Sequence, residues 1–517
     1  MAQVNTKVVA KNTGYLYLRM ILVMGVSLFT SRVILRTLGF EDFGIYNVIG
    51  SVVVFLSFFQ AALRNATFRY LTYNLGEGNA ERLKRVYSMA INTHLLLAII
   101  LLFVMEIGGI WFLNNKLNIA EDRMQAANWV YQFSLIQFCV SIIRTPFESN
   151  ILAHEKMDFY AVTSIMDVVL KLIIVYLLAI IPADKLIVYS LLMLVVALIL
   201  ALWYILYCNR FFSDTKYIRC WDKEMFNQFA SYSGWSLLVN GACVTRSQCI
   251  SIFFNIFMGV LANAALGIAN QVISVLNSFV TNFTQAFKPQ LIKSWASKDY
   301  DYFMKLIFST SKISYYLLLL ISVPVVVNID FALRVWLGDY PSMAPIYIES
   351  IIFYYLVDAL QEPLVCAVHA TGNLKFHQIM VSSIVFLFIP VSYLMLKMGC
   401  SGESVLIANF ITNLICAFGR TIYMRKLINL DVKLYLKKVV VPIVVITCLA
   451  MPIPLGIKYY LHESWTNVII NCTLSVSLIC ILCFTIGLNK SEKQLVYSIP
   501  VFKKILRKWN IVFSKRE

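Results

Sequence analysis

The sequence predicts an all-α integral membrane protein with about 14 transmembrane helices. Hydrophobic residues make up 60% of the 517-residue chain and charged residues only 14%, which is more apolar surface than a soluble core can bury. The apolar residues gather in long runs that short polar connections separate. Runs of this length in lipid must be helical, because the bilayer offers no partners for backbone N–H and C=O groups.

The expected spans follow from a hydropathy window of about 19 residues. They lie near residues 14–37, 43–64, 86–113, 126–144, 159–181, 186–208, 229–258, 262–287, 306–327, 346–368, 376–396, 403–424, 439–457 and 467–488. The first run is too long for a cleavable signal, so we expect it to remain as a helix. Residues 39–44 and Gly259 predict turns between spans, and Pro146 predicts the end of the fourth helix.

The spans divide into two similar halves. We expect an N-terminal lobe of six helices at 1–208, a basic cytoplasmic linker at 209–223 and a C-terminal lobe of six helices at 224–424. Two further helices at 425–488 and a basic amphipathic cytoplasmic tail at 489–517 follow. Gly14 and Gly234 are each predicted to open a helix, and the glycines Gly39 and Gly259 follow at equal separation. An even number of spans per lobe predicts a pseudo-two-fold axis along the membrane normal, with a substrate path between the lobes.

The net charge of +17 is distributed as expected for a membrane protein. With the N-terminus inside, most Lys and Arg residues fall in cytoplasmic connections or tails, and both termini are cytoplasmic. Lys503, Lys504, Arg507 and Lys508 alternate with apolar residues, which predicts a helix on anionic lipid rather than a nucleic-acid partner. The twelve cysteines are scattered, and Cys480 and Cys483 lie in an apolar span without nearby ligands, so no metal site is predicted.

Cations inside the spans are candidate substrate contacts. A charge in the hydrocarbon costs roughly 2.5–3.5 kcal/mol on insertion scales. Arg246 lies mid-span and is expected to face an aqueous cavity. Arg19, Lys312 and Arg420 lie within about two turns of a cytoplasmic helix end and could instead extend to the interface. Together with Arg32, these residues would suit an anionic substrate, because Arg forms bidentate bonds to phosphate.

Four acidic residues in the spans are candidates for ion coupling: Glu106, Asp167, Asp358 and Glu362. Asp167 has Lys171 four residues further along the helix, which favours a local ion pair. Asp358 and Glu362 share one helical face, so one of them should be protonated or meet a cation from another helix. Pro363 follows directly. A site for proton or Na⁺ coupling and a structural kink with a buried ion pair both fit this pattern.

Several short motifs carry a family resemblance. They are Asn263-Ala264-Ala265, Gly267-Ile268-Ala269, Pro289-Gln290, Lys305-Leu306-Ile307, Trp336-Leu337-Gly338 with Pro341, and Ala370-Thr371-Gly372-Asn373-Leu374-Lys375. Over most of residues 10–445 the chain resembles the Wzx-type polysaccharide or O-antigen flippases of the MOP (MATE-like) superfamily. The resemblance is strongest to the lipopolysaccharide biosynthesis proteins of Bacteroidetes. Family members often carry an arginine where this chain has Leu266, so one cationic contact is missing.

The resemblance implies a function by alternating access. An undecaprenyl-diphosphate-linked oligosaccharide would pass from the cytoplasmic to the periplasmic leaflet of the bacterial inner membrane. Arg32 and Arg246, and after them Arg19, Lys312 and Arg420, would engage the diphosphate. A proton or Na⁺ gradient would contribute energy without any other cofactor, and other polysaccharide-assembly proteins would be partners.

Two other classes of membrane protein are alternatives to a flippase. A MATE-like ion-coupled exporter of drugs or metabolites shares the expected fold, but the mid-membrane cations count against cationic drugs. A membrane glycosyltransferase, polymerase or ligase is expected to carry a large external loop, whereas the longest one here, Asn328 to Pro345, is short. No Walker A motif points to ATP-driven transport. We therefore expect a transporter and no enzyme.

Overall fold

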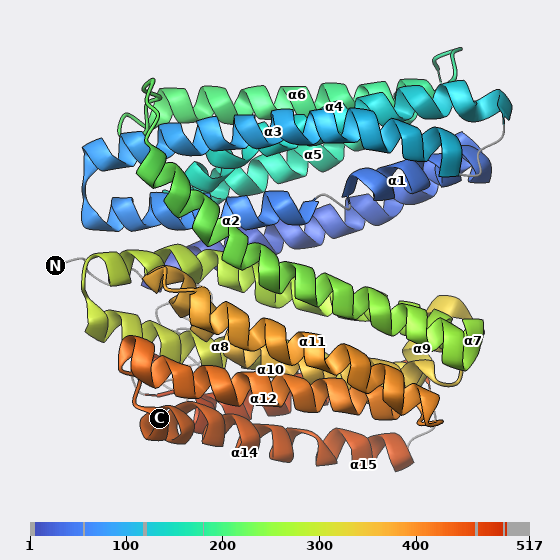
Figure 1. The fold of residues 1–517 in the computed structure, drawn as a ribbon. Coiled ribbons are helices and arrows are strands. Elements are labelled where there is room, and N and C mark those ends of the chain that lie inside the picture. The colour runs from blue at the N-terminus through green and yellow to red at the C-terminus, as the bar shows by residue number, and fades with distance from the viewer. Residues whose placement is uncertain are drawn as a thin grey trace, which may run out of the picture. The chain divides into compact units, whose positions relative to one another are not determined.

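The computed structural model describes residues 6–54, 57–116, 121–178, 180–460, 464–489 and 492–493, and some side chains within α1, α2, α7 and α15 lie outside this description. Every regular element in these ranges is a helix, as the sequence predicted (Figure 1). The elements are α1 (Thr6–Val54), α2 (Ser57–Glu77), α3 (Ala80–Lys116), η1 (Glu121–Arg123), α4 (Met124–Ala153), α5 (Met157–Leu178), α6 (Lys185–Phe211), α7 (Lys223–Ala296), α8 (Tyr300–Val327), α9 (Ile329–Leu337), α10 (Ala344–Thr371), α11 (Lys375–Lys397), α12 (Gly402–Ile428), α13 (Val432–Tyr435), η2 (Leu436–Val440), α14 (Val441–Ala450), α15 (Pro452–Tyr460), α16 (Trp465–Leu482) and η3 (Cys483–Gly487).

Eleven helical segments among the described residues are long and apolar enough to cross a membrane. The sequence predicts three further spans: 14–37 falls within α1, 43–64 covers the end of α1 and the start of α2, and 262–287 falls within the second part of α7. The long α7 contains one break: Gly259 has φ 84° and ψ −178°, a backbone conformation that residues with a Cβ rarely adopt. The predicted turn at Gly259 is therefore confirmed.

Other predicted helix boundaries are wrong. Gly14 and Gly234 do not open helices but lie inside α1 and α7. The first turn of α7 forms earlier because Asp222 Oδ1 accepts the backbone N–H groups of Glu224 and Met225 at 2.9 and 3.1 Å, and an interior glycine costs only about 1 kcal/mol. Residues 39–44, which were predicted to form a turn, are helical and lie inside α1. The ribbon of α1 nevertheless reverses direction in Figure 1.

Helix α4 continues through Pro146 to Ala153, so the predicted stop at this proline is also wrong. A proline removes one backbone donor but does not end a membrane helix where neighbouring helices and Ser or Thr side chains satisfy the freed backbone. Thr145 and Ser141 line this turn and donate to the carbonyls of Ser141 and Phe138 at 2.9 and 2.7 Å. The continuation adds two turns that carry polar residues.

The chain forms two compact units. The N-unit comprises residues 14–240, and the C-unit comprises residues 1–13 and 241–517. The boundary between them falls inside α7, and the predicted basic connection at 209–223 belongs to the N-unit. Within the C-unit, α14 and α16 pack against α8, where the Tyr315 and Thr447 hydroxyls are 2.9 Å apart.

The N-unit is built around α3, α4 and α6. Its core includes the fully buried Val130 and Leu135 of α4 and Leu186 of α6. Tyr131 donates its hydroxyl to the backbone carbonyl of Met105 at 2.7 Å, and a Cβ at Gly109 would lie 1.9 Å from that hydroxyl oxygen. A side chain larger than that of glycine at this position would therefore displace the Tyr131 hydroxyl from the Met105 carbonyl.

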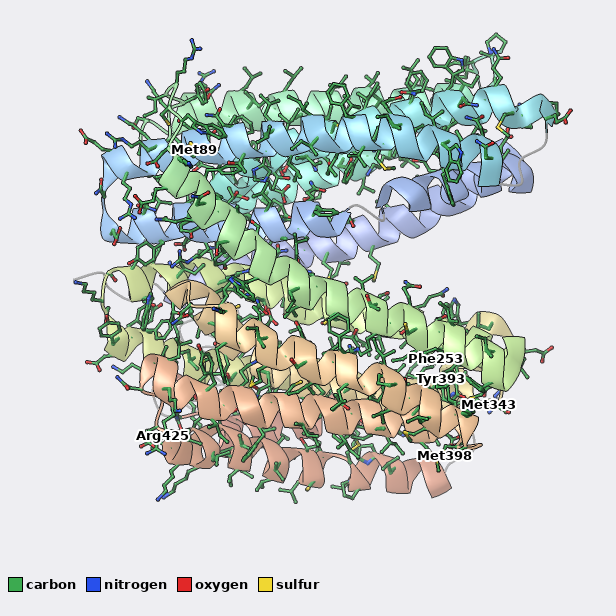
Figure 2. The ribbon with its side chains drawn as sticks, in the orientation of Figure 1. Met89, Phe253, Met343, Tyr393, Met398 and Arg425 are labelled. Atoms are coloured by element: carbon green, nitrogen blue, oxygen red, sulfur yellow. The ribbon has the colours of Figure 1, made fainter. Side chains whose placement is uncertain are left out.

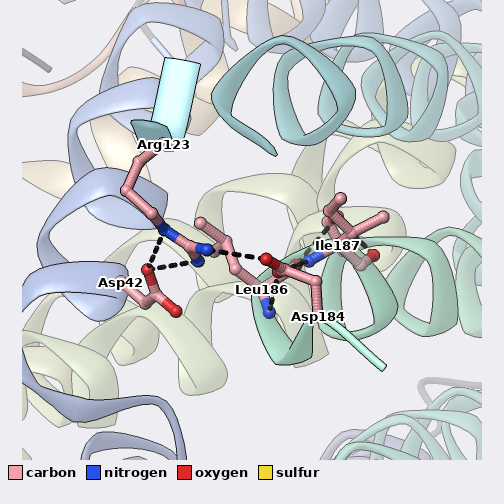
Figure 3. A network of polar contacts seen from close by, with 6 residues as sticks. Asp42, Arg123, Asp184, Leu186 and Ile187 are labelled. Carbon is pink, nitrogen blue, oxygen red and sulfur yellow. Dashed lines mark hydrogen bonds and ion pairs between the residues drawn. The ribbon is translucent and has the colours of Figure 1, made fainter. Parts of the chain in front are cut away.

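Arg123 joins three elements at one end of the N-unit (Figure 3). Its guanidinium lies 2.6 Å from Asp42 of α1 and 2.6 Å from Asp184. Asp184 also caps α6 by accepting from the backbone N–H groups of Leu186 and Ile187. Partial burial opposes ionisation of Asp184, but the hydrogen bonds from Arg123 and the α6 backbone outweigh it and lower its pKa below 3.8. The network thus fixes the starts of α4 and α6 against α1.

A buried ion pair joins α8 to the segment after α16 in the C-unit. Lys312 is only 1% exposed and Glu492 only 7%. Lys312 Nζ lies 2.6 Å from Glu492 Oε2 and 3.2 Å from the carbonyl of Gly487. Glu492 also accepts from Ser309 Oγ at 2.7 Å. The hydrogen bonds compensate the cost of burying both charges.

We predict that breaking this ion pair destabilises the protein more than removing it altogether. Lys312→Met or Glu492→Met alone leaves one buried charge unpaired, which costs about 3–5 kcal/mol. The double variant Lys312→Met/Glu492→Met removes both charges and should recover most of the loss. Thermal unfolding of the purified protein in detergent measures this, and equal losses in the double and single variants would contradict the interpretation.

Candidate functional site

The N-unit contains a group of arginines that we call the arginine cluster: Arg19 of α1, Arg64 of α2 and Arg144 of α4, together with Glu148 of α4. Arg64 Nη2 lies 2.6 Å from Glu148 Oε1. The Arg19 guanidinium lies 4.6 Å from the ring centre of Tyr160, and that of Arg144 lies 5.5 Å from the ring centre of Tyr204. Glu148, Tyr160 and Tyr204 all act electrostatically on Arg64, so these residues form one connected group.

The arginine cluster carries more positive than negative charge. Its four members comprise three guanidinium groups and one carboxylate, which leaves an excess of two positive charges among them. The Arg64 side chain is 38% exposed and that of Glu148 is 12% exposed, so solvent screens the charges only in part. Charges in such surroundings are stable only when they are paired or hydrogen-bonded. The cluster is therefore suited to an added anion, and guanidinium groups bind phosphate oxygens in pairs.

A second polar group, which we call the C-unit cluster, surrounds Arg246. Its Nη1 donates to Asn409 Oδ1 of α12 and its Nη2 to the Tyr354 hydroxyl of α10, both at 3.0 Å. The guanidinium also lies 5.1 Å from the ring centre of Tyr354. Asn413 of α12 donates to the backbone carbonyl of Tyr354 at 2.9 Å. Arg246 thus points toward α10 and α12, and its half-buried side chain has two neutral partners.

Both carboxylates of α10 belong to the C-unit cluster. Asp358 lies one turn after Tyr354, and the cations whose charges act on it are Arg420 and Arg246. Glu362 lies one further turn along and interacts with Asp358, and with the cations Lys288 and Arg420. Helix α10 continues through Pro363. The predicted pair of like charges on one face therefore meets cations from α7 and α12.

Arg420 is buried inside the C-unit rather than extended to the membrane interface. Its side chain is only 6% exposed, and its Nε donates to Nε2 of His377 on α11 at 3.0 Å. That geometry requires the His377 proton on Nδ1, which has no partner among the described residues. The pairing joins α11 and α12 beside the carboxylates of α10.

Lys312, Asp167 and Glu106 make their described contacts outside both clusters. Arg32 is within α1, but its side chain lies outside the described residues. Lys312 forms an ion pair with Glu492. Asp167 forms the expected local ion pair with Lys171 at 2.8 Å. Glu106 accepts from Gln132 Nε2 at 3.1 Å. Among the described residues, no three His, Cys, Asp or Glu side chains are placed to hold a metal ion.

Sequence reasoning missed three members of the arginine cluster: Arg64, Arg144 and Glu148. If α4 ended at Pro146, as predicted, Arg144 and Glu148 would not share one helix. Their spacing of four residues places them on one helical face once α4 continues, and this spacing is the signal that could have identified them. Arg64 joins them only through the packing of α2 against α4.

Comparisons with known proteins agree with the helical architecture. A profile of the family described as polysaccharide biosynthesis protein matches residues 9–295, more than half of the chain. A search of curated protein sequences found no match.

Solved structures share the fold at low sequence identity. A crystal structure of a MATE mutant superposes with a TM-score of 0.72 at 10% identity and covers 84% of this chain and 100% of its own. The MATE transporter VcmN of Vibrio cholerae in its bent form gives 0.67 at 15% identity, with coverage of 84% and 100%. A MOP superfamily transporter from Pyrococcus furiosus, described as having a binding pocket of reverse polarity, gives 0.67 at 11% identity, with coverage of 84% and 99%. The fold is therefore MATE-like.

We predict that Glu148→Gln makes the arginine cluster depend on an added anion. The variant removes the only carboxylate of the cluster and the ion pair with Arg64, which should cost about 1–3 kcal/mol of stability. Added inorganic pyrophosphate should raise the thermal midpoint of this variant more than that of the unchanged protein. Asp167→Asn removes the local ion pair with Lys171 instead and serves as the control. Equal protection of all three proteins by pyrophosphate would contradict the prediction.

Proposed function

Because this chain belongs to the polysaccharide biosynthesis protein family, we propose that it is a flippase for a lipid-linked oligosaccharide. The substrate would be an undecaprenyl-diphosphate-linked repeat unit of an O-antigen or capsular polysaccharide, carried across the membrane by alternating access. The arginine cluster is the observation that carries the proposal. It concentrates three guanidinium groups around one carboxylate, and a diphosphate is an anion of matching chemistry.

In this proposal the arginines act by exchanging partners. Arg64 has its carboxylate partner at 2.6 Å, whereas Arg19 and Arg144 lie against tyrosine rings. A diphosphate would replace Glu148 as the partner of Arg64 and the Tyr204 ring as the partner of Arg144, and each charged hydrogen bond would contribute about 1.5–3 kcal/mol. Arg246 would contact the substrate by releasing two neutral acceptors, Asn409 and Tyr354. Arg420 would act through the C-unit cluster, and Lys312 is left out because Glu492 holds it.

A MATE-like exporter of drugs or metabolites is the alternative, and the shared fold supports it equally. The excess of positive charge in the arginine cluster favours an anionic substrate instead, because an uncompensated guanidinium repels a cationic drug. We propose a transporter and no catalytic reaction.

The proposal also gives the protein a place in the cell. We place it in the bacterial inner membrane with both termini in the cytoplasm, in accordance with the distribution of Lys and Arg. Other polysaccharide-assembly proteins would supply and receive its substrate. No nucleic acid is involved.

We propose further that Asp358 and Glu362 couple transport to a proton or Na⁺ gradient. Both carboxylates are half-buried on one face of α10, and cations of α7 and α12 act on them. Loading or unloading of a proton or Na⁺ here changes the charge balance around Arg246 and Arg420. The occupancy of the carboxylates would thus influence the two arginines.

The first test is the display of surface glycan by cells whose only copy of the protein is a variant. Arg64→Ala and Arg246→Ala should each reduce display by about tenfold or more, because the loss of a charged hydrogen bond to phosphate costs about 1.5–3 kcal/mol. Lys185→Gln removes an exposed cation at the start of α6 and should leave display unchanged. Protein abundance in the membrane is measured in parallel.

Normal display by the Arg64→Ala and Arg246→Ala variants at normal abundance would remove both residues from the substrate site. Normal glycan display together with loss of resistance to a cationic drug would favour the exporter instead.

The second test concerns coupling. Asp358→Asn and Glu362→Gln fix each group in a neutral form. Transport into proteoliposomes by each variant should therefore lose the part of its pH or Na⁺ dependence that the substituted carboxylate causes. Asp167→Asn is the control, because its carboxylate is paired with Lys171 in another unit. If both α10 variants keep the original pH and Na⁺ profiles, the carboxylates have only a structural role.

A further inference from the structure

The connection between α6 and α7, residues 212–222, is held along one face of α3, and we call it the linker. Two contacts involve Asn92 of α3: it accepts from the Tyr217 hydroxyl at 3.2 Å and donates to the carbonyl of Cys220 at 2.9 Å. The backbone N–H of Ile218 donates to Ser88 Oγ at 2.9 Å. Cys220 and Asp222 of the linker also contact Arg85 and Met89 of α3. The contacting residues 85, 88, 89 and 92 are spaced three and four apart, so they form a single stripe along α3.

The two ends of the linker are fixed as well. At its start, Phe212 stacks on His154 with ring centres 4.1 Å apart, and Asp214 lies 3.1 Å from His154 Nε2. At its end, the backbone N–H of Asp222 points to the sulfur of Met89 at 3.3 Å; Met89 is labelled beside the first part of α7 in Figure 2. The linker is therefore an ordered surface and not a loose connection.

Several side chains of the linker are exposed. Tyr217 is 50% exposed and Trp221 is 58% exposed, although the Tyr217 hydroxyl is bonded to Asn92. Lys216 and Arg219 are exposed beside them. Aromatic rings next to cations are typical of the boundary between membrane and water.

The position of the linker along α3 gives its depth in the membrane. The apolar part of α3 begins at Leu95, which is 45% exposed, and Asn92 lies three residues before it. A rise of about 1.5 Å per residue separates the two by about one turn. The linker therefore lies at the level of the lipid headgroups.

The charge of the linker surface is positive. The exposed Arg85 of α3 adds a positive charge to those of Lys216 and Arg219. The charge of Arg85 acts on Cys220 of the linker. The two acidic residues of the linker are engaged elsewhere: Asp214 pairs with His154, and Asp222 accepts the first backbone N–H groups of α7. The carboxylates of Asp214, Asp222 and the exposed Glu224 of α7 oppose four exposed cations, Arg85, Lys216, Arg219 and Lys223, which leaves one positive charge in excess.

We propose that the linker binds the headgroup of an anionic phospholipid. Lys216 and Arg219 would hold the phosphate, and the rings of Tyr217 and Trp221 would lie in the interface beside the acyl chains. Cations near an anionic membrane surface are attracted to it, and a zwitterionic headgroup lacks the net charge that they require. This site is separate from the arginine cluster and does not depend on the transported substrate.

The test is the thermal midpoint of the purified full-length protein in detergent with added lipid. Phosphatidylglycerol should raise the midpoint more than phosphatidylcholine does, and added salt should reduce the difference. Lys216→Gln/Arg219→Gln should lose at least a third of the phosphatidylglycerol-specific rise, because other basic regions of the chain also attract this lipid. A Trp221→Ala variant should lose part of the same rise while keeping its dependence on salt.

The matched control is Lys185→Gln/Lys397→Gln, which removes the same charge from exposed positions at the start of α6 and the end of α11. This control should respond to phosphatidylglycerol as the unchanged protein does. An unaltered response of Lys216→Gln/Arg219→Gln would overturn the proposal. Equal stabilisation by inorganic phosphate at the same concentration would also overturn it, since the site would then recognise free phosphate and not a lipid headgroup.

Discussion

The constraint on which this structure depends is that a charge surrounded by apolar helices must find a partner. The described structure meets this constraint in three ways. Lys312 and Glu492 neutralise one another almost out of contact with solvent. Arg246 donates to two neutral oxygens, and the carboxylate of Asp358 acts on its charge. The arginine cluster has one carboxylate for three guanidinium groups. The first arrangement stabilises the fold, whereas the other two leave attraction available for another anion.

The two clusters differ in the kind of change that they can undergo. In the arginine cluster, Arg144 lies over the ring of Tyr204, a weak contact that an anion can replace. In the C-unit cluster, carboxylates and cations from three helices share one region. The charge state of Asp358 affects Arg420 and Arg246, and that of Glu362 affects Lys288 and Arg420. Binding of a large anion and binding of a small cation would therefore involve different residues. A transporter that couples one to the other needs both kinds of group.

The ends of the helices show the same dependence on a few polar contacts. Arg123 connects α1, α4 and the cap of α6 through two carboxylates. The linker follows a polar stripe of α3, where Asn92 and Ser88 satisfy its side-chain and backbone groups. Both arrangements lie where apolar packing gives way to polar surroundings, because a connection without regular structure must satisfy its backbone locally. Ordered connections keep the helices of the N-unit in register.

The sequence by itself determined the helical class, most of the spans, the turn at Gly259 and the family. These features follow from local properties: the length of apolar runs, the conformational freedom of glycine and short motifs. It also identified Arg246, Asp358 and Glu362 as costly charges in one lobe, but it did not identify their partners. Only the tertiary structure brought together Arg64 and Glu148, 84 residues apart, Arg246 and Asn409, 163 apart, and Lys312 and Glu492, 180 apart. Helical periodicity fixes the face on which a residue lies, whereas helix packing decides which other face it meets. The sequence could therefore locate the charges but could not tell a structural ion pair such as that of Lys312 from an arginine that remains available to a substrate.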